Sequence, residues 1–320
     1  MPGLLALKAA VGLIRVLPMR VALGLAAGLG WLIGALCPIR GRTFRRNLDL
    51  AFGDSLSRAE RGRLIRAAHS HWFRMAVEFF QLPRIRRRFD RFVVDVEGED
   101  IVKANCSAGG RGAIIVSGHL GNWELMPVYG SVRYNLPMTA VAKPLHNRRI
   151  DKWVVELRQS VGVKILSSRE GGRGLRDALR RGETVGFVAD QNAGRRGELL
   201  TFFNHPASTY IGPALMALLM NVPLIPAFAV RCGFQRYRLI FHPPLQPPQN
   251  AASAKEAARD MMQQFNNLLE DLIRRHPEQY FWFHNRWKRR PEDSACARRP
   301  GRSLTSPPAD TGRNREHHET

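Results

Sequence analysis

The chain has 320 residues and a net charge of +22, with 49 lysines and arginines against 27 aspartates and glutamates. The hydrophobic fraction of 44% can fill a sizeable core. The charge indicates an anionic partner, which is a nucleic acid, an anionic membrane surface, or an acidic protein or substrate. The cysteines show neither paired nor metal-ligand spacing, which argues against a disulfide framework and a zinc site; they are Cys37, Cys106, Cys232 and Cys296.

The N-terminal segment has the composition of a membrane helix. No residue from Val21 to Cys37 is charged, and this length is near the lower limit for spanning a bilayer. Arginines flank the run, and the denser cluster follows it, which places the rest of the chain in the cytoplasm. A cleavable signal peptide fits poorly, because the apolar run starts late. We therefore predict a membrane anchor over residues 1–46, either a single membrane helix or an interfacial amphipathic helix.

A helix and a basic segment follow the anchor. Residues 55–92 are predicted to be helical, because apolar residues recur at helical spacing over residues 55–82, with Ser57 as the N-cap and Glu60 three positions on. The next segment is dense in arginine. It is either a solvated basic face or a landing surface for phospholipid or an acidic carrier protein, and its arginines are Arg84, Arg86, Arg87, Arg88 and Arg91.

From about residue 93, short apolar runs alternate with amphipathic stretches. The apolar runs predict strands over residues 92–98, 112–118, 137–143, 163–168, 183–190, 223–231 and 236–245. The amphipathic stretches predict helices over residues 122–132, 147–162, 171–182, 211–222 and 254–277. This alternation predicts an α/β fold with a mostly parallel central sheet flanked by helices. One domain is expected over residues 47–290, followed by a disordered tail over 291–320.

The stretch "SGHLGNWELMP" (residues 117–127) holds the strongest candidate site. His119 follows a predicted strand, and Asn122 is the expected N-cap of the next helix, with Glu124 in its first turn. The turn can fold His119 back onto Glu124, whose carboxylate would fix the imidazole tautomer. Such a base suits an alcohol that attacks an acyl carbonyl. No G-x-S-x-G sequence occurs, which favours direct transfer to an external hydroxyl.

"HLGNWE" resembles the H-x4-D/E motif of the lysophospholipid acyltransferase superfamily, and the chain more specifically resembles the lipid A biosynthesis acyltransferases. Further blocks similar to that family follow in order over roughly residues 5–291: "AVAKPLHNRRID", "GFVADQNAGRRGELLTFFNHPASTYIGPALMA" and "QYFWFHNRWKRRP". Two positions depart from its pattern. Lys143 stands where relatives often have arginine, and Asn204–His205 stand where a glycine is expected.

The resemblance implies a glycerol-phosphate-acyltransferase-like fold and transfer of an acyl chain from acyl carrier protein to a hydroxyl of a lipid A precursor. His119 would be the general base, without a covalent intermediate, and Glu124 its orienting partner. No metal or organic cofactor is implied, and the protein would act at the cytoplasmic face of the bacterial inner membrane. Candidate substrate-binding or orienting residues are Asn122, Lys143, Asn147, Arg148, Asp190 and Gln191.

Two alternatives stay open. The first is the same chemistry on another glycolipid or aminolipid acceptor. The second is a non-enzymatic basic protein that binds a membrane or nucleic acid. The chain shows no nucleic-acid-binding motif, and its basic residues are spread rather than clustered with stacking aromatics, so nucleic acid is not an expected partner.

Overall fold

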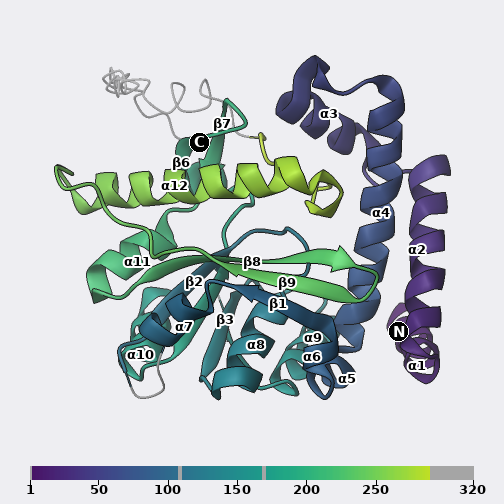
Figure 1. Ribbon diagram of the computed structural model, residues 1–320, viewed down its shortest axis with the longest axis horizontal. Coiled ribbons are helices and arrows are strands. Elements are labelled where there is room, and N and C mark those ends of the chain that lie inside the picture. Colours follow the sequence, from purple (N-terminus) through teal and green to yellow (C-terminus); the bar gives the residue numbers. More distant parts are fainter. Residues whose placement is uncertain (1, 107–109, 168–170, 289–320) are drawn as a thin grey trace, which may run out of the picture.

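The computed structural model describes residues 2–106, 110–167 and 171–288 of the chain (Figure 1). The tail predicted over 291–320 lies outside these residues. A central sheet has helices on both faces, and a long helical pair stands at one end of it. The predicted α/β class is therefore confirmed.

The central sheet has seven strands in the order β1-β9-β8-β2-β5-β3-β4, and every neighbouring pair is parallel except β8 with β9. All five residues of β2 are buried, as expected of an apolar strand covered on both faces. The strands are β1 (Val93–Glu97), β2 (Ala113–Ser117), β3 (Met138–Ala142), β4 (Val163–Ser167), β5 (Thr184–Val188), β8 (Leu224–Gly233) and β9 (Arg236–Phe241).

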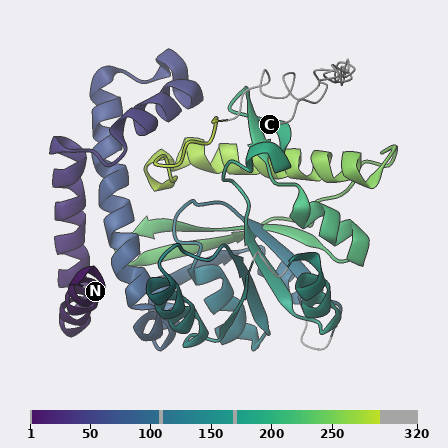
Figure 2. The ribbon, with the colours of Figure 1, turned by 180° about the vertical axis from the view of Figure 1, so that it is seen from behind.

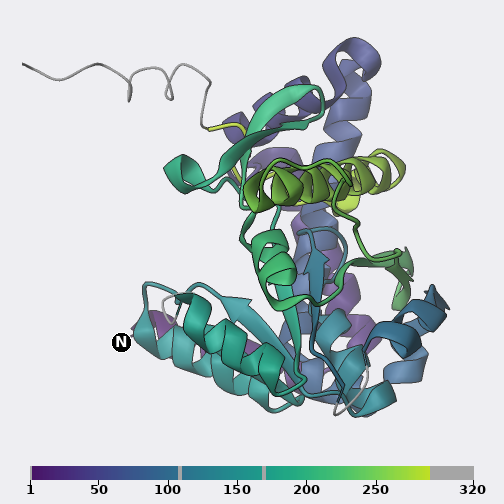
Figure 3. The same cartoon turned by 90° about the vertical axis from the view of Figure 1, so that its left-hand side faces the viewer.

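Alternate side chains of β2 enter two separate cores, because successive residues of a strand point to opposite faces. Ile114 and Val116 pack with Phe265 of α12 (Ala254–Arg275), whereas Ile115 packs with Tyr129 of α8 (Leu125–Tyr134). Figure 3 shows α12 lying across one side of the sheet. The helices of this region are α5 (Leu82–Arg86), α6 (Phe89–Phe92), α7 (Glu99–Asn105), α8 (Leu125–Tyr134), α9 (Arg148–Gln159), α10 (Gly171–Arg180), α11 (Gly212–Met220) and α12 (Ala254–Arg275).

The N-terminal part consists of α1 (Pro2–Val16), α2 (Met19–Leu36), α3 (Gly41–Phe52) and α4 (Arg58–Phe80). The predicted Ser57–Glu60 capping box is present at the start of α4. Helix α3 crosses residue 46, where we placed the end of the anchor, and its Phe44 and Leu48 belong to the main core. The described N-terminal helices are thus packed onto the rest of the protein.

Helices α2 and α4 lie side by side (Figures 1 and 2). A Cβ atom at Gly30 would approach the carbonyl oxygen of His69 to 2.5 Å, so the close approach of the two helices requires glycine there. The opposite face of α2 is an exposed apolar stripe, formed by Val21, Leu25, Leu29, Leu32 and Leu36. Among the described helices, α2 alone is long and apolar enough to cross a membrane.

The structure corrects two local expectations. Helix α8 begins at Leu125, two residues later than the start expected after an N-cap at Asn122, because residues 123 and 124 form a turn. A hairpin of β6 (Glu198–Phe202) and β7 (His205–Thr209) was not predicted. Its turn places Asn204 at φ +58, a left-handed conformation that asparagine tolerates better than most residues. This explains why Asn204 can stand where a glycine was expected.

Candidate active site

His119 and Asp190 meet because of the register of two parallel strands. Ser117 at the end of β2 pairs with Val188 at the end of β5. His119 and Asp190 each lie two residues beyond those positions. Parallel strands end at the same edge of a sheet, so the two side chains are brought together there, as expected of ligand sites in α/β sheets.

The two residues form a close polar pair. His119 Nδ1 lies 2.6 Å from Asp190 Oδ1, and the backbone amide of His119 donates to Asp190 Oδ2 at 3.0 Å. The Asp190 side chain is 2% exposed, whereas the imidazole is 18% exposed. Because a carboxylate accepts from Nδ1–H, this arrangement leaves the lone pair on Nε2. The imidazole is therefore oriented as a base with a reachable Nε2.

Asp190 stays ionised despite its burial. Burial alone would raise the pKa of its carboxyl group, but the charge of a protonated His119 and the two hydrogen bonds from that residue outweigh burial. Arg286 adds a smaller effect in the same direction. The pKa of Asp190 therefore falls below its ordinary value, and the carboxylate can stabilise an imidazolium.

The Nε2 side of the imidazole has polar and aromatic neighbours. The side-chain nitrogen of Gln191 lies 3.3 Å from Nε2. The ring of Trp123 lies 4.6 Å from the imidazole, centroid to centroid, and that of Phe281 lies 5.8 Å away. Such a wall limits the directions from which a hydroxyl can reach Nε2.

Glu124 does not orient His119, contrary to the expectation from the H-x4-E spacing. Both of its oxygens accept hydrogen bonds from Arg158 of α9, at 3.0 and 2.6 Å. No hydrogen bond joins Glu124 and His119 among the described residues. The physical reason is the late start of α8, which leaves Glu124 in a turn from which it reaches α9.

The Glu124–Arg158 pair borders a narrow cavity of about 100 Å³. The cavity lies along the sheet face that packs against α8, and most of its lining is apolar. Trp123 lines it too, and the same ring contacts His119. Further lining residues are Ile115, Met126, Met138, Ala140, Phe187 and Phe241.

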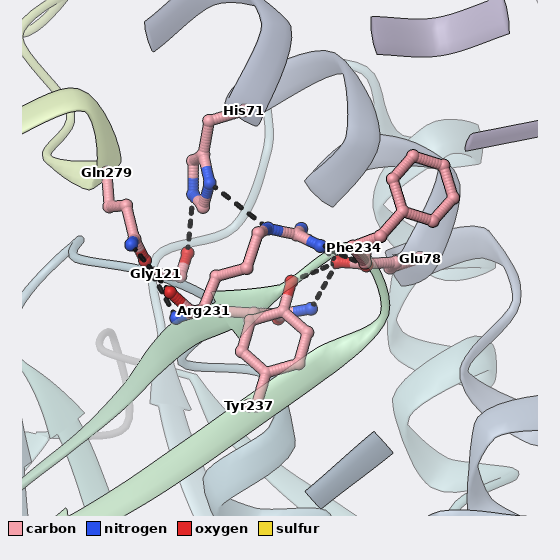
Figure 4. Close-up of polar contacts among 8 residues, drawn as sticks. His71, Glu78, Gly121, Arg231, Phe234, Tyr237 and Gln279 are labelled. Atoms are coloured by element: carbon pink, nitrogen blue, oxygen red, sulfur yellow. Dashed lines mark hydrogen bonds and ion pairs between the residues drawn. The ribbon is translucent and has the colours of Figure 1, made fainter. Parts of the chain in front are cut away.

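A buried polar network supports the turn that carries His119 (Figure 4). Arg231 donates to both oxygens of Glu78, at 2.9 and 2.8 Å, and Tyr237 also donates to Glu78. The ring of His71 bonds the carbonyl oxygen of Gly121 at 3.2 Å. Burial, and then the charge of Arg231, lower the pKa of His71 well below its ordinary value, so this ring is neutral.

Asn122 belongs to this network rather than to a helix cap. Its Nδ2 donates to Glu78 at 3.1 Å, and the residue is fully buried. The predictions of an N-cap and of a substrate ligand are therefore not supported by its position. The neighbouring Gly121 has φ +62, and a Cβ atom there would lie 1.9 Å from the carbonyl oxygen of Ala229. Glycine is thus required in the turn.

The residues expected to bind substrate after β3 are exposed. Lys143 lies in the loop that leads to α9, Asn147 is the N-cap of that helix and Arg148 is its first residue. The Asn147 side chain caps the helix by accepting from two backbone amides. Since β3 pairs with β5, this loop lies on the same edge of the sheet as Asp190. Among the described residues, no hydrogen bond or ion pair links the three to His119 or Asp190.

Sequence reasoning missed Arg158, Arg231 and Glu78. Glu78 stands in the apolar run "MAVEFF", and a carboxylate in such a run is the signal that a buried partner exists. Arg158 stands in a polar stretch of α9 and gave no comparable signal. Within residues 2–106, 110–167 and 171–288, no three histidine, cysteine, aspartate or glutamate side chains are grouped so as to hold a metal ion.

Comparison with known proteins gives this geometry a family. The family model of the bacterial lipid A biosynthesis acyltransferases matches residues 4–289. The chain belongs to this acyltransferase family. The match includes the His119 turn, the strand that ends before Asp190 and the closing segment with Phe281.

Individual relatives agree with the family. The chain is 30% identical over 287 residues to the lipid A biosynthesis palmitoleoyltransferase of Escherichia coli (strain K12), covering 86% of this chain and 87% of that protein. It is 28% identical over 282 residues to the lipid A biosynthesis lauroyltransferase of the same strain, covering 86% and 88%. It is also 30% identical over 176 residues to the phosphatidylinositol mannoside acyltransferase of Mycolicibacterium smegmatis, covering 54% and 56%.

Proposed function

We propose that the protein transfers a fatty acyl chain from a thioester on acyl carrier protein to a hydroxyl group of a lipid A precursor. The observation that carries this proposal is the His119–Asp190 pair, which leaves Nε2 as a reachable base in a chain of the lipid A acyltransferase family. No covalent acyl-enzyme is required.

The proposed step is a direct acyl transfer. His119 Nε2 accepts the proton of the acceptor hydroxyl while the oxygen of that hydroxyl attacks the thioester carbonyl carbon. The carbon–sulfur bond then breaks, and the leaving thiolate takes the proton from Nε2, which returns the imidazole to its neutral form. Asp190 keeps the Nδ1–H tautomer and stabilises the imidazolium between these events. Gln191, which borders Nε2, would orient the incoming hydroxyl.

The narrow cavity beside Glu124 and Arg158 is the proposed site of the acyl chain. Its apolar lining suits a hydrocarbon chain, and about 100 Å³ suits an unbranched chain better than a bulky ring system. Trp123 separates the cavity from His119 and contacts both. In this assignment, the Glu124–Arg158 pair fixes the polar end of the cavity.

We propose that α1 and α2 lie in the membrane interface, with the exposed stripe of α2 toward the lipid. Helix α4 packs along α2, and the guanidinium of Arg66 on α4 lies 5.7 Å from the Trp31 ring of α2. A spanning α2 would therefore bring α4 and its arginines into hydrocarbon, which is costly. The interfacial arrangement keeps the catalytic residues on one side, the cytoplasmic face of the inner membrane.

Acyl carrier protein is proposed to dock at a basic concavity of about 990 Å³ near the start of α2. Its rim includes three of the arginines expected to receive this acidic partner, Arg84, Arg88 and Arg91. Opposite charge steers such an encounter. We name it the arginine groove, and its five arginines are Arg20, Arg84, Arg88, Arg91 and Arg236.

A second acceptor class has support from one observation. The similarity to a phosphatidylinositol mannoside acyltransferase covers about half of each chain. The same base and cavity would serve a hydroxyl on that kind of glycolipid. An assay must therefore offer more than one acceptor.

The decisive experiment is a transfer assay on membranes that contain the protein. Acyl-carrier-protein thioesters of several chain lengths are supplied with either a tetra-acylated lipid A precursor or a phosphatidylinositol mannoside, and products are read by mass. An added chain on the lipid A precursor, lost in His119→Ala, is the expected result. An added chain on the mannoside alone would show that the acceptor is this glycolipid and not the lipid A precursor. No thioester consumption with any acceptor would overturn the proposed function.

A further inference from the structure

A second basic concavity lies next to the His119–Asp190 pair and has no part in the step described above. It measures about 630 Å³ and is assembled from the turn between α2 and α3, the loop after β5 and the closing segment after α12. We call it the polar pocket. The residues that matter for its chemistry are Arg40, Asn192, Arg195, His284, Asn285 and Lys288.

The polar pocket is lined by the residue that follows Gln191, the neighbour of the His119 imidazole. Gln191 contacts His119 Nε2, and the next residue, Asn192, lines the pocket. The backbone amide of Asn192 donates to His284 Nε2 at 2.9 Å, and its side chain donates to the carbonyl oxygen of Arg286 at 3.1 Å. These bonds hold Asn192 against the closing segment, while its neighbour Gln191 contacts His119 Nε2, so the pocket wall and the base are connected through two successive residues.

The charges around the polar pocket are of one sign. Arg40, Arg195 and Lys288 line it, and none of its lining residues in the described part of the chain is a carboxylate. Within the part of the chain that the structure describes, none of these three cations forms an ion pair. Burial lowers the pKa of His284 to about 4, so this ring is neutral and adds no charge. The three cations therefore lack an internal counterion and favour an anionic ligand.

The ligand expected here also has neutral polar groups. Asn285 lines the polar pocket, and its side-chain oxygen is buried without a hydrogen-bond partner among the described residues. A buried acceptor of this kind is unfavourable unless a donor reaches it. A sugar hydroxyl supplies such a donor, whereas a bare inorganic anion does not.

The backbone at Arg40 is a further sign of a functional position. Arg40 has φ +49, in the left-handed region where glycine is the least strained residue. Arg40 directly follows Ile39, which is exposed. The apolar stripe of α2 ends at Leu36, four residues before Arg40. If that stripe faces lipid, Arg40 lies at the level of the headgroups.

We propose that the polar pocket binds a phosphate ester on the headgroup of the glycolipid acceptor and thereby places the acceptor hydroxyl at His119 Nε2. Arginine pairs well with phosphate through two parallel hydrogen bonds, and lysine adds a point charge. This inference rests on the proposed function, because it assigns the acceptor to one side of the imidazole.

The arginine groove is a poorer site for the acceptor headgroup. Its floor includes Phe92 and Phe234, and it lies at the opposite end of α2 from Arg40. Among the described residues, none that contacts His119 lines it. A headgroup bound there would have no defined position relative to Nε2. The two concavities therefore divide the anionic partners between them.

The test compares two triple variants that each remove three positive charges. The pocket variant is Arg40→Gly, Arg195→Gln and Lys288→Gln, in which glycine suits the left-handed backbone at residue 40. The control variant is Arg111→Gln, Arg173→Gln and Arg180→Gln, which are exposed residues on and near α10. Thermal melting of both variants tests whether they remain folded. Single Arg40→Gly is expected to melt no lower than the wild type.

Kinetics are measured with a phosphorylated lipid A precursor and with the same lipid after phosphatase treatment. For the pocket variant, KM for the phosphorylated acceptor is expected to rise at least tenfold, with kcat and the KM for the acyl donor near wild type. With the wild type, removing the phosphate from the acceptor should raise the acceptor KM by the same factor. With the pocket variant, removing the phosphate should raise the acceptor KM little further. The control variant should behave as the wild type.

Several outcomes would overturn the proposal. An unchanged acceptor KM, an equal rise for both acceptors, or a rise in the donor KM instead would each do so. If the wild type transfers no chain at all, the proposed function fails, and binding of glucose 1-phosphate and of inorganic phosphate by calorimetry still tests the polar pocket. Binding of the sugar phosphate that is lost in the pocket variant alone supports a headgroup site. Equal binding by all three proteins, or none, rejects it.

Discussion

Asp190 and Glu124 are both carboxylates beside the same turn, yet they have different partners. Asp190 is bonded to the imidazole and the backbone amide of His119, and it lies 71 residues further along the chain. Glu124 lies five residues from His119 and is bonded to the guanidinium of Arg158. Glu124, which is nearer to His119 in sequence, is therefore not the residue bonded to the imidazole. Strand register brings Asp190 to the imidazole instead.

The two environments differ in what a missing charge would leave behind. Without Asp190, the imidazole would lose the group that selects its tautomer. Without Glu124, the Arg158 guanidinium would be left without its partner at the edge of the apolar cavity. The first change acts on proton transfer, and the second acts on the shape and stability of the cavity. The following predictions test this division.

His119→Ala should have the largest effect. A positioned general base contributes roughly 10²- to 10⁴-fold, so kcat is expected to fall by that factor while membrane binding and circular dichroism stay the same. Turnover is measured with matched amounts of protein. Wild-type turnover in this variant would show that His119 is not the base. The comparison of Asp190 with Glu124 would then have no bearing on catalysis.

Asp190→Asn should come next. Asp190 accepts hydrogen bonds with both oxygens, and asparagine has one acceptor oxygen and one donor nitrogen. If the amide nitrogen faces Nδ1, the tautomer reverses and Nε2 carries the proton. We expect kcat to fall about 10²-fold with little change in either KM.

The control for Asp190→Asn is thermal melting, because the residue is buried. A change in kcat of less than threefold in a folded Asp190→Asn protein would show that the carboxylate is only a structural acceptor. A loss confined to KM would indicate that Asp190 helps to bind substrate instead.

Glu124→Gln should affect stability and donor binding more than kcat. Breaking a largely buried pair destabilises the fold, here by roughly 1–3 kcal/mol because part of Arg158 reaches solvent. We expect the factor by which kcat falls in Glu124→Gln to be at least ten times smaller than the factor in Asp190→Asn. The double variant Glu124→Gln/Arg158→Met should be no less stable than Glu124→Gln, since the partners share one interaction.

The comparison would be reversed by one result for Glu124→Gln. If its melting temperature equals that of the wild type while kcat falls as far as in Asp190→Asn, then Glu124 takes part in the chemistry directly. Measurement of both quantities on the same preparation separates the two cases.

The smallest effect concerns pH and the histidines around the site. His71 and His284 have pKa values lowered mainly by burial, in the case of His284 to about 4. The unfolded chain takes up protons on these rings below about pH 6.5, and the folded protein does not. Stability is therefore complete above that pH and declines as the pH falls from 6.5 toward 4.

Melting temperatures at pH 7, 6 and 5 test this sign. Asp190 adds no change in this window because its pKa lies below the ordinary value. His69, His242 and His276, whose pKa values burial also lowers, act in the same direction as His71 and His284, whereas burial raises the pKa of Glu270 and acts against them. The decline should be smaller in His71→Asn, which removes one of the rings. A melting temperature that rises on acidification would contradict the assignment of neutral rings.

The sequence by itself determined the seven strands of the central sheet, most helices and the chemical class of the protein, but not the hairpin of β6 and β7. Apolar runs bounded by glycine and polar residues predicted the central sheet, because a parallel sheet buries both faces of each strand. The capping box at Ser57 predicted the start of α4 for a local reason that needs no tertiary contact. His119 could be singled out because a strand end followed by a tight turn is where α/β sheets form their sites.

Only the tertiary structure decided which side chains meet. The partner of His119 depends on the register of β2 with β5, and that of Glu124 depends on the place of α9. Neither can be obtained from spacing, because register and helix packing are set by contacts between segments far apart in the chain. The same holds for the polar pocket, whose cations Arg40, Arg195 and Lys288 come from three distant segments that the fold brings together around one concavity.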